Sequence, residues 1–264
     1  MSPHRVNARE APQVPSNSPK PLAVSDDGGA DSGRMEPVTL TTERLVLRPF
    51  RPSDTDAVFA ACQDPDIQRW TSVPSPYERA HAEDFTGRIC PENWRDDVTY
   101  DFAVVTKGDG ALVGAMGLVR LAHLRSPEHQ AELGYWTARE QRRRGYTGEA
   151  ARAVIEWAFT RLGVERLEWC SEAGNEGSRA VALGVGFRME GTDRARIVHQ
   201  GTRRDAWRGA LLPSDWGLPS TTPYLPAKAA VAANAPQEPE ASGRADRADR
   251  ADRADRASTA PSVA

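Results

Sequence analysis

Residues 132–150 read ELGYWTAREQRRRGYTGEA, and this stretch decides the fold. Its first residues alternate apolar and polar side chains and predict a strand that ends at Thr137. A helix is predicted from about Tyr146 to Leu162, because apolar residues recur there at helical spacing. A short basic loop with two glycines joins the two elements. The stretch therefore predicts a strand, a glycine-containing loop and a helix in direct succession.

The start of this helix is a candidate anion site. The first amides of a helix have no partner within the helix, and the helix dipole adds partial positive charge there. Gly145 and Gly148 allow the backbone to approach a phosphate closely. Arg142, Arg143 and Arg144 add cations suited to phosphate oxygens. The loop matches neither the Walker pattern nor the three-glycine dinucleotide pattern, so it predicts a different pyrophosphate-bearing ligand, or only a basic loop that caps a helix.

The rest of residues 37–218 predicts one domain in which strands and helices form a mixed sheet with helices against it. Helices are expected after Pro52-Ser53-Asp54, around Tyr77–Ile89 and at Ser178–Leu183, besides the one already named. The expected strands are Thr39–Phe50, Thr99–Thr106, Ala111–Leu121, Gln130–Thr137, Glu165–Cys170, Phe187–Glu190, Ala195–Gln200 and Thr202–Leu211. The order gives an antiparallel meander followed by a strand-helix-strand unit, which is an α+β class.

The two ends of the chain have a different composition. Residues 1–36 are rich in Pro, Ser, Gly and Asp, and residues 219–264 include an Arg-Ala-Asp repeat over residues 244–256. A three-residue period builds no apolar stripe for packing, so both segments are predicted to be disordered tails. The repeat is either an interaction segment or solvated low-complexity sequence.

Composition excludes several classes of protein. The net charge of the 264 residues is -3, whereas proteins that coat nucleic acid carry a basic surplus. No apolar run approaches the ~18 residues of a membrane span, and the N-terminus has no apolar core of a signal peptide. Three distant cysteines and scattered histidines give no disulfide framework and no metal spacing. The sequence predicts a soluble, cytoplasmic protein without a metal site.

The loop resembles the acetyl-CoA pyrophosphate loop of the GNAT superfamily of N-acetyltransferases, in the form Arg142-x-x-Gly145-x-Thr147. Other segments resemble the ribosomal-protein alanine acetyltransferase (RimJ/RimL-like) branch of that family. These are TERLVLR at 42–48, AELGYW at 131–136, Asn-x-x-Ser at 175–178, LGVGF at 183–187 and the closing Asp-Trp at 215–216. Thr147 and Gly148 depart from the usual Ala-Thr pair. A glycine in the first helical turn weakens the helix by roughly 0.5–1 kcal/mol.

The resemblance implies a mostly antiparallel sheet splayed at its centre, with helices on both faces and the pantetheine arm of acetyl-CoA in the gap. It implies direct transfer of an acetyl group to a primary amine, with backbone amides near Tyr135 holding the oxyanion. Acetyl-CoA is a co-substrate and no metal is implied. The residues expected to bind it are Tyr135, Trp136, Thr137, Arg142, Arg143, Arg144, Gly145, Tyr146, Thr147, Gly148 and Asn175. Asn175 is equally a turn residue, and the two aromatic residues are equally core residues.

Two residues are candidates for catalysis. Glu132 lies on the strand that leads into the loop and would accept a proton from the amine; alternatively it is a carboxylate paired to an arginine. Ser178 stands where family members place a hydroxyl near the CoA sulfur; alternatively it caps the helix that starts there.

The partner predicted by this reasoning is an amine acceptor, either a protein N-terminus or a small molecule. An α-amine, with a pKa of about 7.7–8.0, is partly neutral near pH 7, whereas a lysine at about 10.4 is not. Membrane and nucleic-acid partners are not expected, and the protein is expected to be a monomer or a homodimer. Two other functions stay open: a CoA-binding regulatory module without catalysis, and a ribosome or nucleic-acid docking protein that uses the arginines.

Overall fold

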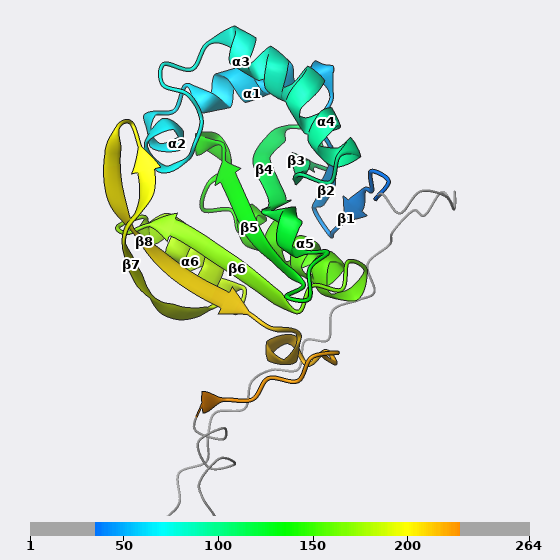
Figure 1. Ribbon diagram of the computed structural model, residues 1–264. Coiled ribbons are helices and arrows are strands. Elements are labelled where there is room, and N and C mark those ends of the chain that lie inside the picture. The colour runs from blue at the N-terminus through cyan, green and yellow to red at the C-terminus, as the bar shows by residue number, and fades with distance from the viewer. Residues whose placement is uncertain (1–34, 228–264) are drawn as a thin grey trace, which may run out of the picture. The chain divides into compact units, whose positions relative to one another are not determined.

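The computed structural model describes residues 35–227, and its central feature is one eight-stranded sheet in the order β1-β2-β3-β4-β5-β6-β8-β7 (Figure 1). The strands are β1 (Leu40–Thr41), β2 (Leu45–Pro49), β3 (Tyr100–Thr106), β4 (Leu112–Val119), β5 (Gln130–Thr137), β6 (Arg166–Glu172), β7 (Arg188–His199) and β8 (Thr202–Leu211). Neighbouring strands are antiparallel except β5 and β6, which are parallel. The mixed, mostly antiparallel sheet confirms the predicted fold class.

The sheet is split between its two parallel strands. β5 and β6 pair only where Gln130–Glu132 faces Arg166–Glu168. Beyond these pairs β5 continues to Thr137 along β4, while β6 continues to Glu172 along β8. Their ribbons diverge in Figure 1. The split leaves one backbone edge of β5 without a strand partner over its second half.

Helices cover both faces of the sheet. α1 (Thr55–Cys62), α2 (Pro65–Trp70), α3 (Arg79–Asp84) and α4 (Cys90–Arg95) precede β3, and a π-helical turn (Phe85–Ile89) joins α3 to α4. α5 (Tyr146–Thr160) follows the basic loop and α6 (Glu176–Gly184) follows β6. Short 3-10 turns lie at Pro52–Asp54, Leu121–His123, Arg139–Gln141 and Pro213–Trp216. Figure 1 shows α1, α3 and α4 gathered on one side and α5 and α6 on the other.

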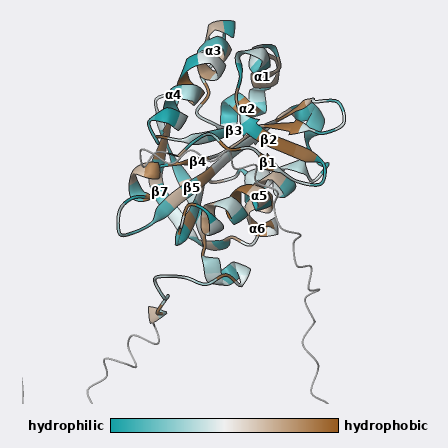
Figure 2. Cartoon of the chain, turned by 90° about the vertical axis from the view of Figure 1, so that its right-hand side faces the viewer, coloured by the Kyte–Doolittle hydropathy of each residue, from teal (hydrophilic) through white to brown (hydrophobic). Residues whose placement is uncertain are grey.

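Two apolar clusters hold these layers together. The larger one lies between the sheet and α5 and includes Trp94, Trp157 and Trp169, each 1% exposed. The smaller one lies between the sheet and α1–α3 and includes Phe50 and Val58. Figure 2 shows the apolar colouring concentrated in the central strands. Successive side chains of a strand point to opposite faces of the sheet, so the central strands contribute apolar residues to both clusters.

Four differences separate the predicted elements from the structure. The strand predicted at 39–50 is two strands, β1 and β2, which pair antiparallel. The helix predicted at 77–89 continues through its π-helical turn to Arg95, and α2 was not predicted. The two strands predicted at 187–190 and 195–200 are one strand, β7, with irregular pairing to β8 between Asp193 and Ile197. The residues between the two predicted strands, GTDR at 191–194, carry no apolar side chain, so the alternation is interrupted there.

Residues just outside the predicted domain bounds, 37–218, form hydrogen bonds with the domain. The amide of Met35 lies 3.4 Å from Asp97 Oδ1, and the amide of Thr221 donates to Glu165 Oε1 at 2.8 Å. Contacts group the chain into one unit that ends at Thr222 and a second that begins at Pro223. The predicted disorder of 1–34 and 228–264, including the Arg-Ala-Asp repeat, lies outside the described residues. Within residues 35–227, no helix is long and apolar enough to cross a bilayer.

Candidate active site

A cleft of about 680 Å³ opens where β5 and β6 separate. It is lined by the end of β5, the basic loop, the start of α6 and one side of α2. The lining includes Trp70, Tyr135, Arg142, Arg143, Thr147 and Ser178. The split in the sheet and the glycine loop therefore border the same space, as the sequence predicted.

The basic loop enters α5 through a left-handed residue. Gly145 is the N-cap of α5, with φ 77° and ψ 0°. A residue with a Cβ is strained in that conformation, so glycine is required here. The hydroxyls of Thr137 and Thr147 lie 2.7 Å apart and join the end of β5 to the first turn of α5. The unpaired first amides of α5 thus begin beside the cleft.

Thr42 and Arg44, about 100 residues earlier in the sequence, form hydrogen bonds with this loop and with the first turn of α5. Glu149 accepts hydrogen bonds from Thr42 Oγ1 at 2.5 Å and from the amide and Nε of Arg44 at 2.9 and 2.6 Å. Arg44 Nη1 also donates to the carbonyl of Arg144 at 3.0 Å. Burial raises the pKa of Glu149, but these hydrogen bonds lower it more, so the pKa lies below its usual range. The TERL segment, which the sequence identified by resemblance only, therefore supports the loop.

The three consecutive arginines of the loop, Arg142, Arg143 and Arg144, differ in their surroundings. Arg142 donates to Asp64 Oδ2 at 2.5 Å, to Asp66 Oδ2 at 3.1 Å and to the carbonyl of Thr137 at 3.1 Å. Within the described part of the chain, no carboxylate forms an ion pair with Arg143 or Arg144. Of these three, Arg143 and Arg144 are therefore the cations without a carboxylate partner, while the guanidinium of Arg142 is held by two acidic side chains.

α2 bridges the two sides of the split. Asp64 and Asp66 attach its start to Arg142 of the loop, and Arg69 near its end forms two hydrogen bonds of 2.7 Å with the buried Glu172 of β6. Hydrogen bonding to Arg69 lowers the pKa of Glu172. The sequence signal for this missed helix is Asp64-Pro65, since Asp64 Oδ1 accepts from the amide of Asp66 at 3.0 Å and proline occupies the first helical position.

Ser178 belongs to a buried hydrogen-bond chain. Its Oγ accepts from Trp169 Nε1 at 3.0 Å and lies 3.2 Å from the hydroxyl of Tyr135, to which it donates. The Tyr135 hydroxyl donates in turn to the carbonyl of Ser178 at 2.8 Å. Burial raises the pKa of Tyr135 to about 12.

The alternative role of Ser178 as a helix cap is wrong. α6 begins two residues earlier, at Glu176, and its N-cap is Asn175, whose Oδ1 accepts from the amide of Ser178 at 3.1 Å. Ser178 is the third residue of the helix, and its hydroxyl faces Tyr135 and Trp169 rather than a free helical amide.

Glu132 lies on the other face of the sheet. By strand alternation it shares that face with Gly134 and Trp136, whereas Leu133 and Tyr135 pack toward α5. Its Oε2 is 2.8 Å from Arg120 Nε, so the predicted pairing with an arginine is confirmed. Burial and, less strongly, Glu168 raise the pKa of Glu132, while Arg120 and Arg196 oppose the increase. Glu132 does not line the 680 Å³ cleft.

Residues 44–188 match the family described as acetyltransferase (GNAT) domain. The chain belongs to this family. It is 36% identical over 179 residues to the Bacillus subtilis protein named "Putative ribosomal N-acetyltransferase YdaF", a match that covers 66% of this chain and 94% of that protein. The GNAT fold accounts for the split sheet, and the match confirms that this chain is an acetyl-CoA-dependent N-acetyltransferase.

Solved GNAT structures agree with this assignment. A structure titled as a putative ribosomal-protein-serine acetyltransferase from Vibrio cholerae aligns with a TM-score of 0.60 and 27% identity, over 66% of this chain and 97% of that one. A GNAT acetyltransferase from Brucella melitensis aligns with a TM-score of 0.60 and 27% identity, over 70% and 82% of the two chains. These relatives support the predicted RimJ/RimL-like branch.

The GNAT domain thus collects most of the predicted cofactor residues at one cleft. Tyr135, Trp136, Thr137, Arg142, Arg143, Thr147, Asn175 and Ser178 all line it. Arg144, Gly145, Tyr146 and Gly148 belong to the loop and the first turn of α5 beside it. Within residues 35–227, no cluster of three His, Cys, Asp or Glu side chains has metal-binding geometry.

Proposed function

We propose that this chain transfers the acetyl group of acetyl-CoA directly to a primary amine, with the pantetheine arm lying in the split between β5 and β6. One observation carries the proposal: the unpaired edge of β5, the glycine loop and the first turn of α5 border the same cleft. The edge offers hydrogen bonds to the amides of the arm, and the loop offers amides to the pyrophosphate. Arg143 and Arg144 supply the cations.

The two catalytic candidates approach the split from opposite faces of the sheet. Glu132 would take one proton from the ammonium, leaving a neutral amine to attack the thioester carbon. Amides of β5 near Tyr135 would hold the oxyanion. As the C–S bond breaks, the nitrogen loses its second proton and the sulfur gains one, relayed by the hydroxyl of Ser178. The raised pKa of Glu132 makes its carboxylate a stronger base than an ordinary glutamate.

The acceptor is proposed to be a primary amine on a protein N-terminus or on a small molecule. Relatives named for ribosomal proteins favour an α-amine, and the lower pKa of an α-amine makes it easier to deprotonate than lysine. The carboxylate at Glu132 is the feature that favours an enzyme over a CoA-binding module without catalysis.

Calorimetric titration with acetyl-CoA, followed by thiol release with a panel of amines, tests the proposal. Arg143→Gln should weaken acetyl-CoA binding, whereas the control Arg161→Gln, at the far end of α5, should not. Equal affinity in both variants would show that the loop is not the pyrophosphate site. Binding of acetyl-CoA without thiol release for any amine would favour the regulatory module.

A further inference from the structure

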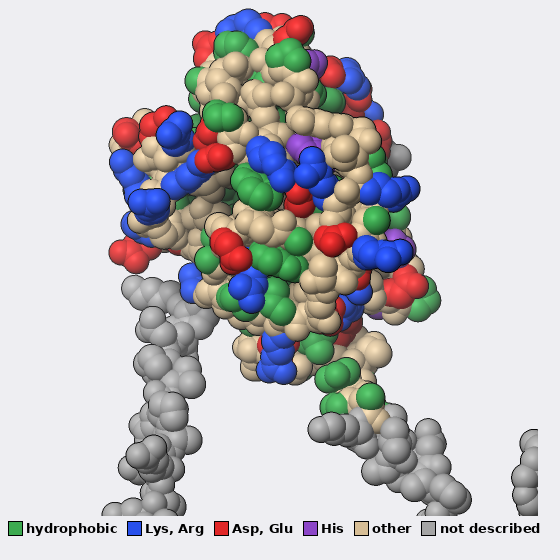
Figure 3. Space-filling model, turned by 90° about the vertical axis from the view of Figure 1, so that its left-hand side faces the viewer, with side chains coloured by type: hydrophobic (Ala, Val, Ile, Leu, Met, Phe, Trp, Pro, Cys, Tyr) green, Lys and Arg blue, Asp and Glu red, His purple; other side chains and the backbone are tan. Residues whose placement is uncertain are grey.

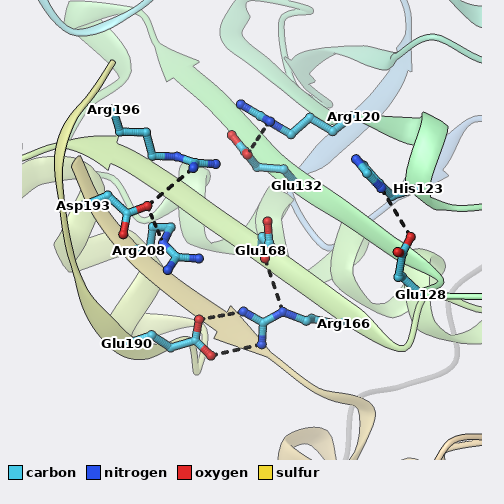
Figure 4. Close-up of polar contacts among 10 residues, drawn as sticks. All are labelled: Arg120, His123, Glu128, Glu132, Arg166, Glu168, Glu190, Asp193, Arg196 and Arg208. Atoms are coloured by element: carbon cyan, nitrogen blue, oxygen red, sulfur yellow. Dashed lines mark hydrogen bonds and ion pairs between the residues drawn. The ribbon is translucent and has the colours of Figure 1, made fainter. Parts of the chain in front are cut away.

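A second, smaller pocket lies on the face of the sheet that carries Glu132. Its volume is about 220 Å³, and its lining is almost entirely polar. The lining residues are Arg120, His123, Gln130, Ala131, Glu168, Arg196 and Arg208. Figure 4 shows five of these side chains: Arg120 and His123 from the segment after β4, Glu168 from β6, Arg196 from β7 and Arg208 from β8. Its three guanidinium groups stand beside the carboxylates of Glu132, Glu168 and Asp193, so the pocket is rich in arginine donors without a surplus of positive charge.

Each arginine of this pocket has an acidic partner, and two of them share one. Arg208 Nε and Arg196 Nη1 share one oxygen, Oδ2 of Asp193, at 2.7 and 3.4 Å. Arg120 pairs with Glu132. Glu168 pairs with Arg166, which also holds Glu190. Figure 3 shows basic and acidic side chains interspersed over one surface of the protein.

Two buried polar atoms here are held by ion pairs that lack the alignment of a good hydrogen bond. One is Oε2 of Glu132, 2.8 Å from Arg120 Nε, and the other is Nε of Arg208, 2.7 Å from Asp193 Oδ2. Both atoms therefore have a charged partner. A ligand that carries a donor and an acceptor would improve the hydrogen bonding of both.

The two atoms lie two strands apart on the same sheet face. Glu132 is paired with Glu168 of β6, and Arg208 is paired with Cys170, two residues further along β6. Strands are spaced about 4.8 Å apart, so the two backbones are separated by roughly 10 Å across the sheet. By strand alternation, both side chains lie on the face of the sheet that carries Glu168.

We propose that this pocket binds a carboxylate of the acceptor, while the amine of the same acceptor lies at Glu132. The proposal rests on the proposed function and names its substrate class: amines that carry a carboxylate close to the amino group. A fork of guanidinium donors suits a carboxylate. Two sources share this chemistry, a free amino acid and a peptide N-terminus with an acidic second residue.

Equilibrium binding of reaction products tests the pocket without requiring catalysis. The full-length protein, loaded with CoA, is titrated with N-acetylalanine against N-acetylalaninamide, and with N-acetyl-Ala-Asp-amide against N-acetyl-Ala-Asn-amide. We expect the acid to bind at least about tenfold more tightly than its neutral partner in one of the two pairs, which identifies the source. Equal binding within both pairs overturns the proposal.

Substitutions assign the preference to this pocket. Arg208→Gln and, independently, Arg196→Gln should remove the preference for the acid, while Arg203→Gln, on the exposed β7–β8 hairpin, should keep it. Retention of the full preference in both pocket variants overturns the assignment. Failure of the proposed function is seen separately, as the absence of thiol release with any amine, because product binding does not depend on turnover.

Discussion

Ser178→Ala should destabilise the protein although Ser178 caps no helix. The Oγ atom of Ser178 is the acceptor for Nε1 of Trp169, a residue that is 1% exposed. Removing it leaves a buried indole N–H without a partner, which costs about 1–3 kcal/mol. For a domain of this size each kcal/mol corresponds to about 2–4 °C, so the expected decrease in Tm is roughly 2–12 °C.

A double-mutant cycle isolates that contribution. Trp169→Phe removes the donor together with part of the ring, and the cavity it creates is common to both arms of the cycle. In that background Ser178→Ala should cost at least about 1 kcal/mol less, measured by urea unfolding. An equal cost in both backgrounds, or a Ser178→Ala protein with wild-type Tm, would refute the hydrogen-bond argument.

The same variant separates the structural role from the catalytic one. Turnover per folded molecule should fall for Ser178→Ala and should not recover at high pH, because the missing hydroxyl serves the departing sulfur. Asn175→Ala provides the comparison for loss of the real cap, with an expected cost of about 0.5–2 kcal/mol. Normal turnover per folded Ser178→Ala molecule would remove Ser178 from the mechanism.

Four further outcomes are expected. Because burial raises the pKa of Glu132, kcat/KM should fall as pH decreases through that pKa; Glu132→Gln should lower the rate ~10²–10⁴-fold, abolish this dependence and recover partly at high pH. Arg120→Gln removes a cation that lowers this pKa, so the acid limb should move to higher pH. Gly148→Ala should add about 0.5–1 kcal/mol of stability by thermal unfolding, because a Cβ there meets only ordinary contacts at 3.5 and 4.0 Å. Gly134→Val should raise the KM for the amine and spare acetyl-CoA affinity, since a Cβ at Gly134 lies on the face that carries Glu132 and meets only Val119 Cγ1, at 3.9 Å.

Periodicity made the sheet and α5 predictable from the sequence. The β5 prediction, Gln130–Thr137, matches the structure at both ends, because alternation and the following glycine loop define it. α2 has only six residues, too few to show a helical period. The β7 strand is divided in two by the sequence prediction because residues 191–194, GTDR, carry no apolar side chain that would continue the alternation.

The candidate site was predictable only where its residues are local in sequence. Glycines and arginines of the loop are adjacent, so their common role is visible. The acidic partners of Arg142 lie 76 and 78 residues away, and nothing in the sequence pairs them. For Glu132 the two predicted roles, a general base and a carboxylate paired to an arginine, are compatible. It is paired with Arg120, and this pairing lowers the pKa of the carboxylate that is proposed to act as the base.

The position of α2 links the two halves of the proposed reaction. Its ion pairs reach the loop after β5 through Arg142 and the end of β6 through Glu172, so α2 spans both sides of the split. α2 and the residue that follows it present Ile67, Trp70 and Thr71 to the cleft. The side chain of Arg142 cannot turn toward a pyrophosphate without leaving Asp64 and Asp66. Acetyl-CoA binding that recruits Arg142 would therefore release the start of α2 and reshape the wall that the acceptor meets, whereas binding through Arg143 and Arg144 alone leaves that wall in place.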